Sequence, residues 1–240
     1  MKTYCIFTYI LANVLLFVLD WVKGIIGVTF DLSNDRNVYS LRFESPMNYL
    51  AHLHLAKHTN TSFTGNLVAD FCHASQMKKL PLEIQSGIAM HQFVDKTLDS
   101  HVSSIHFRAE QQIGRRRFAG IVQDLLMDYW LVNKWSQYND VSLDLFYQEF
   151  LPDLREHKGL VNQAYQRLIE SLDQERWLGN LGELKGIQKA LMSIVKSWRY
   201  GDYLMPFYYA LPELIDNSES LFDVVYPDVI NAVKEKALLI

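Results

Sequence analysis

Apolar residues recur three and four positions apart along most of this chain, with polar residues between them. This spacing is typical of helices that bury one face, whereas the alternation typical of strands is scarce. We therefore expect an all-α fold, formed as a single compact helical domain without internal repeats. The pattern predicts helices over residues 48–57, 82–100, 101–112, 118–135, 143–154, 160–172, 183–200 and 221–238, and a further helix that carries Asp70.

Several residues mark where these helices start and stop. Pro81 suits the first turn of helix 82–100, and Ser142 is a good N-cap for helix 143–154. The hydroxyl-rich turn at 59–64 supplies caps for the helix with Asp70. Two aromatic-rich segments, 203–209 and 221–226, are interpreted as core packing.

Residues 1–46 differ from the rest of the chain. The apolar run over 4–19 is shorter than the roughly 18–20 residues that a membrane span needs, although its length resembles a signal-peptide core. Lys2 is the only early charge, and no clean small-residue cleavage site follows. Because a regular helical pattern starts directly after Met47, we interpret 1–46 as a gene-start artefact and 47–240 as the domain. The alternative is a real membrane anchor.

Composition narrows the class of protein. The chain has 240 residues, of which 49% are hydrophobic, so it can bury a sizeable core. A net charge of −4 gives no general case for nucleic-acid binding. Cys5 and Cys72 form no spacing motif, which favours a reducing cytoplasm over a disulfide scaffold.

Acidic side chains and imidazoles interrupt the apolar pattern between residues 70 and 128. His91 and Asp95 are four apart and share a helix face, and Asp124 and Asp128 repeat this spacing on the next long helix. Like charges at this spacing repel, but a divalent cation between the helices would turn repulsion into attraction. With Asp70, this donor set of oxygens and a few imidazoles suits Mn²⁺ or Mg²⁺ and points to a metal-dependent hydrolase.

Each of these positions also has an ordinary structural interpretation. Asp99, one turn after Asp95, is as well explained as a solvated surface charge, and Asp124 could pair with an arginine of the basic run. His52 and His54 are two apart, so at most one of them faces the site if their segment is helical. The other histidines show no comparable partner pattern.

The run from Arg115 to Arg117 is the densest basic feature of this acidic chain. Three successive arginines are most often a solvated helix start. Because they stand directly before the helix of Asp124, they could also receive a phosphate or an acidic partner.

From Met47 onward, the order of segments resembles the acyl carrier protein phosphodiesterase family. The segments are MNYLAHLHLA, GNLVADF, MHQFVD, RRxxAGIVQDLLMDYWL and a late LFDVVYP, and together they span 47–240. The resemblance implies an all-helical relative of the His-Asp (HD) domain metal-dependent phosphohydrolases. It also implies hydrolysis of the phosphodiester between 4′-phosphopantetheine and a serine of acyl carrier protein, with Mn²⁺ as the cofactor and Mg²⁺ as an alternative.

Roles follow for the matching positions. The resemblance implies His52, rather than His54, as a metal ligand beside His91, Asp95, Asp124 and Asp128. Asp70 is then the group that orients or deprotonates water, and Arg116 and Arg117 stabilise phosphoryl oxygens. Because the carrier protein is acidic, we expect a docking surface at Lys78, Lys79, Arg108 and Arg115.

The chain departs from the family pattern at two positions. Gln92 stands where the family often has Arg, and Tyr129 where it often has His. Two other functions remain open at this point: a phosphohydrolase acting on a nucleotide or another small phosphodiester, and a non-enzymatic helical interaction protein whose aspartates form salt bridges.

Overall fold

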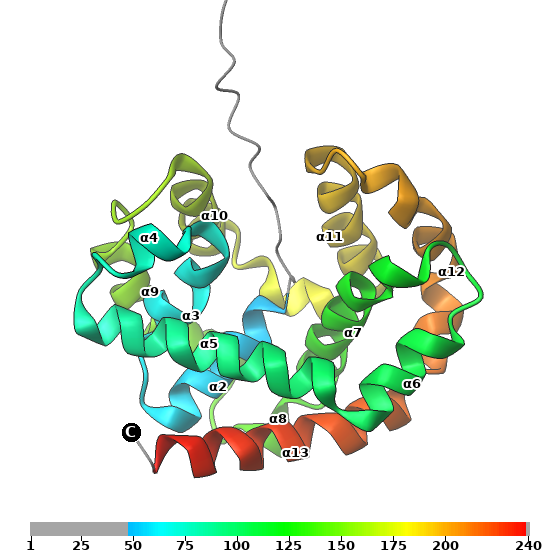
Figure 1. Cartoon of the computed structure of the whole chain (residues 1–240), viewed down its shortest axis with the longest axis horizontal. Helices are drawn as coiled ribbons and strands as arrows, with labels where there is room; N and C mark the ends of the chain where they lie inside the picture. The colour runs from blue at the N-terminus through cyan, green and yellow to red at the C-terminus, as the bar shows by residue number, and fades with distance from the viewer. Residues whose placement is uncertain (1–47, 239–240) are drawn as a thin grey trace, which may run out of the picture. The chain divides into compact units, whose positions relative to one another are not determined.

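The computed structural model describes residues 48–238, and the predictions for residues 1–46 lie outside this part. The described chain is helical and contains no strand, which confirms the predicted all-α class. Figure 1 shows the arrangement. The helices are α2 Tyr49–Thr59, α3 Phe63–Val68, η1 Ala69–Phe71, α4 Ala74–Met77, α5 Leu82–Ser100, α6 Val102–Glu110, η2 Arg116–Phe118, α7 Ala119–Asn133, α8 Trp135–Tyr138, α9 Leu143–Glu156, α10 Gln163–Glu175, η3 Trp177–Gly182, α11 Leu184–Ser197, η4 Gly201–Leu204, α12 Met205–Asp216 and α13 Glu219–Ala237.

Most predicted helices are present, and the differences have local causes. Helix α5 has the predicted bounds, and the Ser142 hydroxyl caps α9 by accepting the Leu145 N–H. Helix α10 starts three residues later than predicted because the Asn162 side chain caps it. Asp70 lies in the 3₁₀ turn η1 after α3, and the aromatic segment 203–209 runs from η4 into helix α12.

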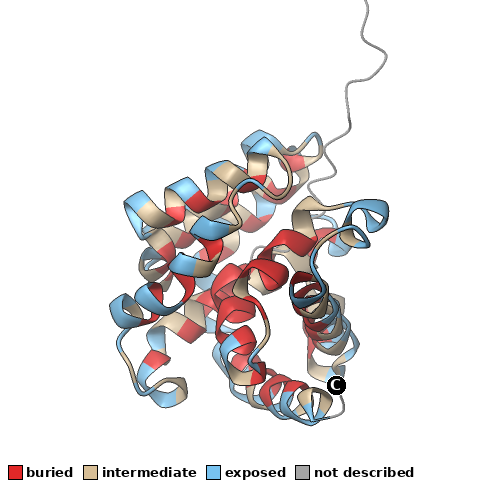
Figure 2. Ribbon diagram, turned by 90° about the vertical axis from the view of Figure 1, so that its left-hand side faces the viewer, coloured by how far each residue is buried: buried red, intermediate tan, exposed pale blue. Residues whose placement is uncertain are grey.

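Helix α2 lies inside the molecule. Every residue from Tyr49 to Ala56 is buried, and α3, α5, α7 and α13 contact it. Figure 2 shows that buried positions follow the inner sides of the helices. Because α2 is buried on all sides, its two histidines, His52 and His54, must find polar partners or ligands in the interior.

Helices α3 and α5 approach closely at two glycines. A Cβ atom on Gly87 would lie 2.7 Å from the Ser62 carbonyl oxygen and 2.8 Å from the Gly65 Cα. A Cβ on Gly65 would lie 2.5 Å from the Ile84 carbonyl oxygen. Only two residues without side chains allow this contact, which sets α3 against the turn of α5 that carries His91.

We expect Gly87→Ala to lower the free energy of unfolding by about 2 kcal/mol, because the methyl group pushes α3 away from α5. Urea denaturation measures this change. Gly159→Ala is the matched control, since a Cβ there has no atom within 4 Å. Equal stabilities of the two variants would contradict the tight contact.

No helix within residues 48–238 has the length and apolar character required to cross a membrane.

Candidate metal centre

Two imidazoles from α2 and α5 converge on one carboxylate. His52 Nε2 lies 3.1 Å from Asp95 Oδ1, and His91 Nε2 lies 3.1 Å from Asp95 Oδ2. The two rings are stacked, with centroids 4.0 Å apart. One ligand atom from each residue falls within 4.8 Å of the others. Ligands about 2.1 Å from a cation on neighbouring vertices of an octahedron are themselves about 3 Å apart, so this spacing fits a divalent metal.

His52 gives the test of whether a metal fits. Its ring is fully buried, yet Nδ1 has no hydrogen-bond partner among the described residues. The Nε2 atom faces Asp95 without the alignment of a hydrogen bond. A buried ring nitrogen without a hydrogen bond costs free energy, and a cation bound at Nε2 would satisfy the nitrogen that faces Asp95. The residues present therefore fit a bound cation at His52, His91 and Asp95.

The backbone of α3 orients His91. The Nδ1 atom of His91 lies 2.6 Å from the carbonyl oxygen of Asn66, which can only accept a hydrogen bond. Nδ1 therefore carries a proton, and the lone pair of Nε2 is available when the ring is neutral. Metal-binding histidines typically have such a second partner, which sets the tautomer and the ring orientation.

The carboxylates make this site strongly negative. Burial lowers the pKa of His91, but Asp70 and Asp95 outweigh burial and hold it above its usual range. Burial, and then the charge of His91, lower the pKa of His52, so the two stacked rings are not both positively charged. Burial raises the pKa of Asp95, yet its contacts with both histidines bring it below its ordinary value. The negative potential of these carboxylates, which favours the protonated form of His91, also attracts a metal cation.

Asp70 and Asp124 border the three residues. Asp70 Oδ1 lies 3.2 Å from His91 Nε2, and its side chain is only 5% exposed. Burial first, and then the carboxylates of Asp95 and its acidic neighbours, raise the pKa of Asp124. Asp124 is therefore close enough to the acidic group to feel its charge. Within residues 48–238 it forms no ion pair with the arginines of the basic run.

Asp128 has a position that spacing alone did not suggest. It is fully buried, and its two carboxylate oxygens accept the backbone N–H groups of Leu50 and Ala51 at 3.0 and 2.9 Å. These are orphan donors in the first turn of α2, so Asp128 caps the helix that carries His52. Burial raises the pKa of Asp128 to about 8, although both N–H donors act in the opposite direction. Asp128 is not part of the three-residue group.

His54 points away from the centre, into the core. Its Nε2 donates to the Tyr138 carbonyl oxygen at 3.1 Å, so its Nδ1 accepts from the Tyr226 hydroxyl at 2.8 Å. Burial, and then the charge of His58, lower the pKa of His54 to about 3. His54 is therefore a neutral structural residue.

The basic residues predicted to bind phosphate lie on the surface. Arg116 and Arg117 are exposed in η2, and neither contacts the three-residue group. The guanidinium of Arg117 lies over the Phe118 ring, 4.6 Å from its centroid. The structure does not place these arginines against the centre, so their catalytic role remains a prediction.

Two of the four predicted docking residues, Arg108 and Arg115, already contact other residues of the same molecule. The Arg108 guanidinium binds the Asp99 carboxylate and the Gln123 side chain, at 3.2 and 3.1 Å. Asp99 is 73% exposed, as expected of a surface charge. Arg115 stacks on the ring of Tyr203 at 3.7 Å. Lys78 and Lys79 are exposed at the end of α4.

An apolar pocket of about 350 Å³ is lined in part by sequence neighbours of the candidate site residues. Tyr49, Phe71 and Ile121 line it, and they come from α2, η1 and α7, each no more than three residues from His52, Asp70 or Asp124. Helices α10 and α11 form its other walls, with Arg167 and Lys189 among the lining residues. Ligand pockets of proteins typically have volumes of about 300–1,000 Å³.

The two departures from the family pattern lie outside the three-residue group. Gln92 is exposed, and its amide contacts the Met77 sulfur at 3.7 Å. The ring of Tyr129 packs edge-on against Trp130, with centroids 5.1 Å apart. Sequence reasoning missed the Asn66 carbonyl, because a main-chain acceptor leaves no signal in residue type.

Comparisons with known proteins show which family the chain is related to. The family model for acyl carrier protein phosphodiesterase matches residues 47–229. A protein of that name from Yersinia pestis is 31% identical over 193 residues, which cover 80% of this chain and 100% of the relative. Others from Escherichia coli O6:H1 and Klebsiella pneumoniae are 32% identical over 196 and 197 residues, with the same coverage. No solved structure matches.

A family model that covers most of the chain, together with relatives matched along their whole length, establishes the relationship. The family name denotes hydrolases of phosphodiester bonds. The chain belongs to the acyl carrier protein phosphodiesterase family.

Proposed function

We propose that this protein hydrolyses the phosphodiester between 4′-phosphopantetheine and a serine of acyl carrier protein, with Mn²⁺ as its metal and the cytoplasm as its location. The products are apo carrier protein and free 4′-phosphopantetheine. The observation that carries the proposal is the convergence of His52, His91 and Asp95 in a chain of this family. Mg²⁺ is the alternative metal, since oxygen-rich sites accept either ion.

The residues of the chain have distinct roles in this proposal. His52, His91 and Asp95 hold the cation, and the half-buried Asp124 adds a further carboxylate close to them. When bound, the cation supplies an acidified water and neutralises charge on phosphoryl oxygens. Asp70 takes the proton of the attacking water at a carboxylate oxygen in this proposal, which is supported by its place beside His91 and its side chain being almost entirely shielded from solvent.

Arg116 and Arg117 are proposed to bind the substrate phosphate from the start of α7. Arg117, Ile121 and Asp124 follow one another four and three residues apart, so they lie along one side of this segment. Ile121 lines the apolar pocket, so this side of α7 forms part of the pocket wall. Guanidinium groups bind phosphoryl oxygens in two-pronged geometry and offset their developing charge.

The test is incubation of the purified full chain with holo acyl carrier protein and Mn²⁺, followed by mass spectrometry of the carrier. We expect loss of the phosphopantetheine mass with Mn²⁺ and none after treatment with a chelator. Restoration by Mn²⁺ after chelation is the control for irreversible damage. Intact holo carrier in the presence of either Mn²⁺ or Mg²⁺ would overturn the proposal.

A further inference from the structure

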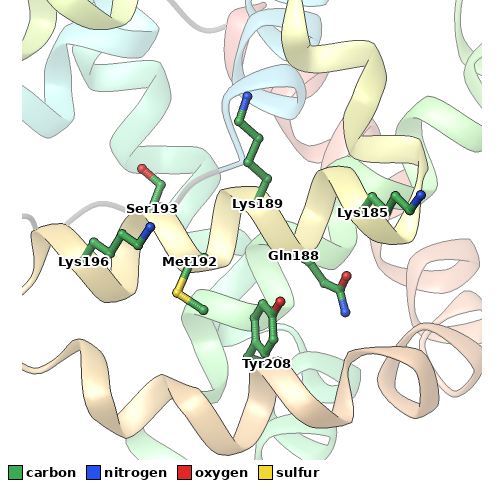
Figure 3. Close-up of a pocket in the computed structure, with 7 residues that line it drawn as sticks. All are labelled: Lys185, Gln188, Lys189, Met192, Ser193, Lys196 and Tyr208. Atoms are coloured by element: carbon green, nitrogen blue, oxygen red, sulfur yellow. The ribbon is translucent and has the colours of Figure 1, made fainter.

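Lysines gather on the outer face of α11, beside the apolar pocket. Lys185, Lys189 and Lys196 are four and seven residues apart, so they follow one stripe of the helix. They line a shallow surface pocket of about 450 Å³ together with Met192 and Tyr208. Figure 3 shows the three lysines spread along α11, with Tyr208 reaching toward it from α12. We call these three residues the lysine ridge.

The lysine ridge borders the apolar pocket. Lys189 and Ser193 line both the surface pocket and the apolar pocket, so the two pockets are adjacent along α11. The apolar pocket in turn is lined by Phe71, which follows Asp70 directly, and by Ile121, one turn before Asp124. A partner bound on the ridge would therefore stand at the edge of a pocket whose walls include residues next to Asp70 and one turn from Asp124.

The charges of the ridge are available to a partner. Lys185 and Lys196 form no ion pair with another residue of the described part, and Lys189 has one loose contact, 3.7 Å from Glu175. By contrast, Lys57, Lys134, Lys158, Arg108 and Arg155 all pair with acidic side chains of the same molecule. Unpaired lysines in a chain of net charge −4 are suited to an acidic partner.

We propose that the lysine ridge of α11 is the docking surface for the acidic carrier protein. This inference rests on the proposed function and adds where the protein part of the substrate binds. An anionic substrate is repelled by the carboxylates of Asp70, Asp95 and Asp124, so cations at the pocket edge are needed to steer it inward. The ridge meets this need better than Arg108 and Arg115, which are engaged in internal contacts.

The test reverses the two unpaired charges in the full chain, as Lys185→Glu/Lys196→Glu. We expect the KM for holo carrier protein to rise about tenfold at low salt while kcat changes less than about twofold, because docking charges act on encounter and not on chemistry. The difference from the unmutated protein should nearly vanish at about 0.3 M salt, where screening suppresses steering. Binding of holo carrier to metal-free protein, measured by calorimetry, should weaken by the same factor.

Matched variants separate docking from net charge and from folding. Lys158→Glu/Lys234→Glu changes net charge equally on other surfaces and should leave the KM unchanged. Lys185→Gln/Lys196→Gln should give a smaller increase in KM, and turnover of the small diester bis(p-nitrophenyl) phosphate should be equal in all variants.

Each other outcome has a defined meaning. An unmutated protein that releases no phosphopantetheine overturns the proposed function and the docking surface with it. An active unmutated protein whose ridge variant keeps its KM overturns the docking surface alone. The same holds if Lys78→Glu/Lys79→Glu raises the KM and the ridge variant does not, since docking would then lie at α4.

Discussion

Asp95→Asn is expected to abolish both Mn²⁺ binding and phosphodiesterase activity while leaving the fold intact. Asp95 is the carboxylate that both imidazoles face, and an amide in its place removes the negative charge that attracts the cation. Loss of a residue that only supports a metal ligand typically costs 10–100-fold. Loss of the shared ligand should therefore lower kcat/KM by more than about 100-fold.

Two measurements test this expectation. Titration calorimetry should show Mn²⁺ binding to the unmutated protein and none to the variant. In thermal unfolding, the Tm of the unmutated protein should rise with Mn²⁺, because a ligand bound only by the folded state stabilises that state. The Tm of the variant should not change with Mn²⁺.

Asp99→Asn is the matched control for Asp95→Asn. Asp99 follows Asp95 by one turn of the same helix, but its carboxylate is 73% exposed and pairs with Arg108. We expect its Mn²⁺ affinity and its activity to stay within about twofold of the unmutated protein, as for most surface substitutions. An Asp95→Asn variant that keeps metal-dependent activity would remove Asp95 from the centre.

The part of the site within one helix was accessible from the sequence. His91 and Asp95 are four residues apart, and because α5 is regular over its whole predicted length, their side chains meet as the spacing requires. Asp124 on α7 feels the charge of the acidic group, and its role as a ligand stays a prediction. The choice of His52 over His54 came from the family resemblance, since two residues on one helix differ only in which neighbours they meet.

The rest of the site depends on contacts between distant segments. The Asn66 carbonyl meets His91 across 25 residues, and Asp128 meets α2 across 77 and 78 residues. Gly65 and Gly87 set the close approach of α3 to α5, but the sequence does not indicate that these two glycines meet. Spacing places Asp124 and Asp128 on one face of α7, but packing decides that Asp128 meets the end of α2. The lysine ridge did leave a signal in the sequence, since its members are four and seven residues apart on one helix. The denser basic run at 115–117 was the more prominent basic feature.

Asp128→Ala is expected to lower the free energy of unfolding by about 3 kcal/mol. The substitution leaves the N–H groups of Leu50 and Ala51 buried without an acceptor, and each such donor costs about 1–3 kcal/mol. Because α2 carries His52, we also expect weaker Mn²⁺ binding. Urea denaturation measures the loss of stability, with the unmutated protein and Asp99→Ala as references.

Denaturation in the presence of a chelator separates the helix-capping role of Asp128 from a role as metal ligand. A capping residue stabilises α2 with or without metal, so the deficit of Asp128→Ala should persist in chelator. Asp128→Asn should lose about half as much, since its amide oxygen can still accept one N–H group. If the deficit of Asp128→Ala disappears in chelator, Asp128 acts on the metal, and its contacts with α2 contribute little to stability.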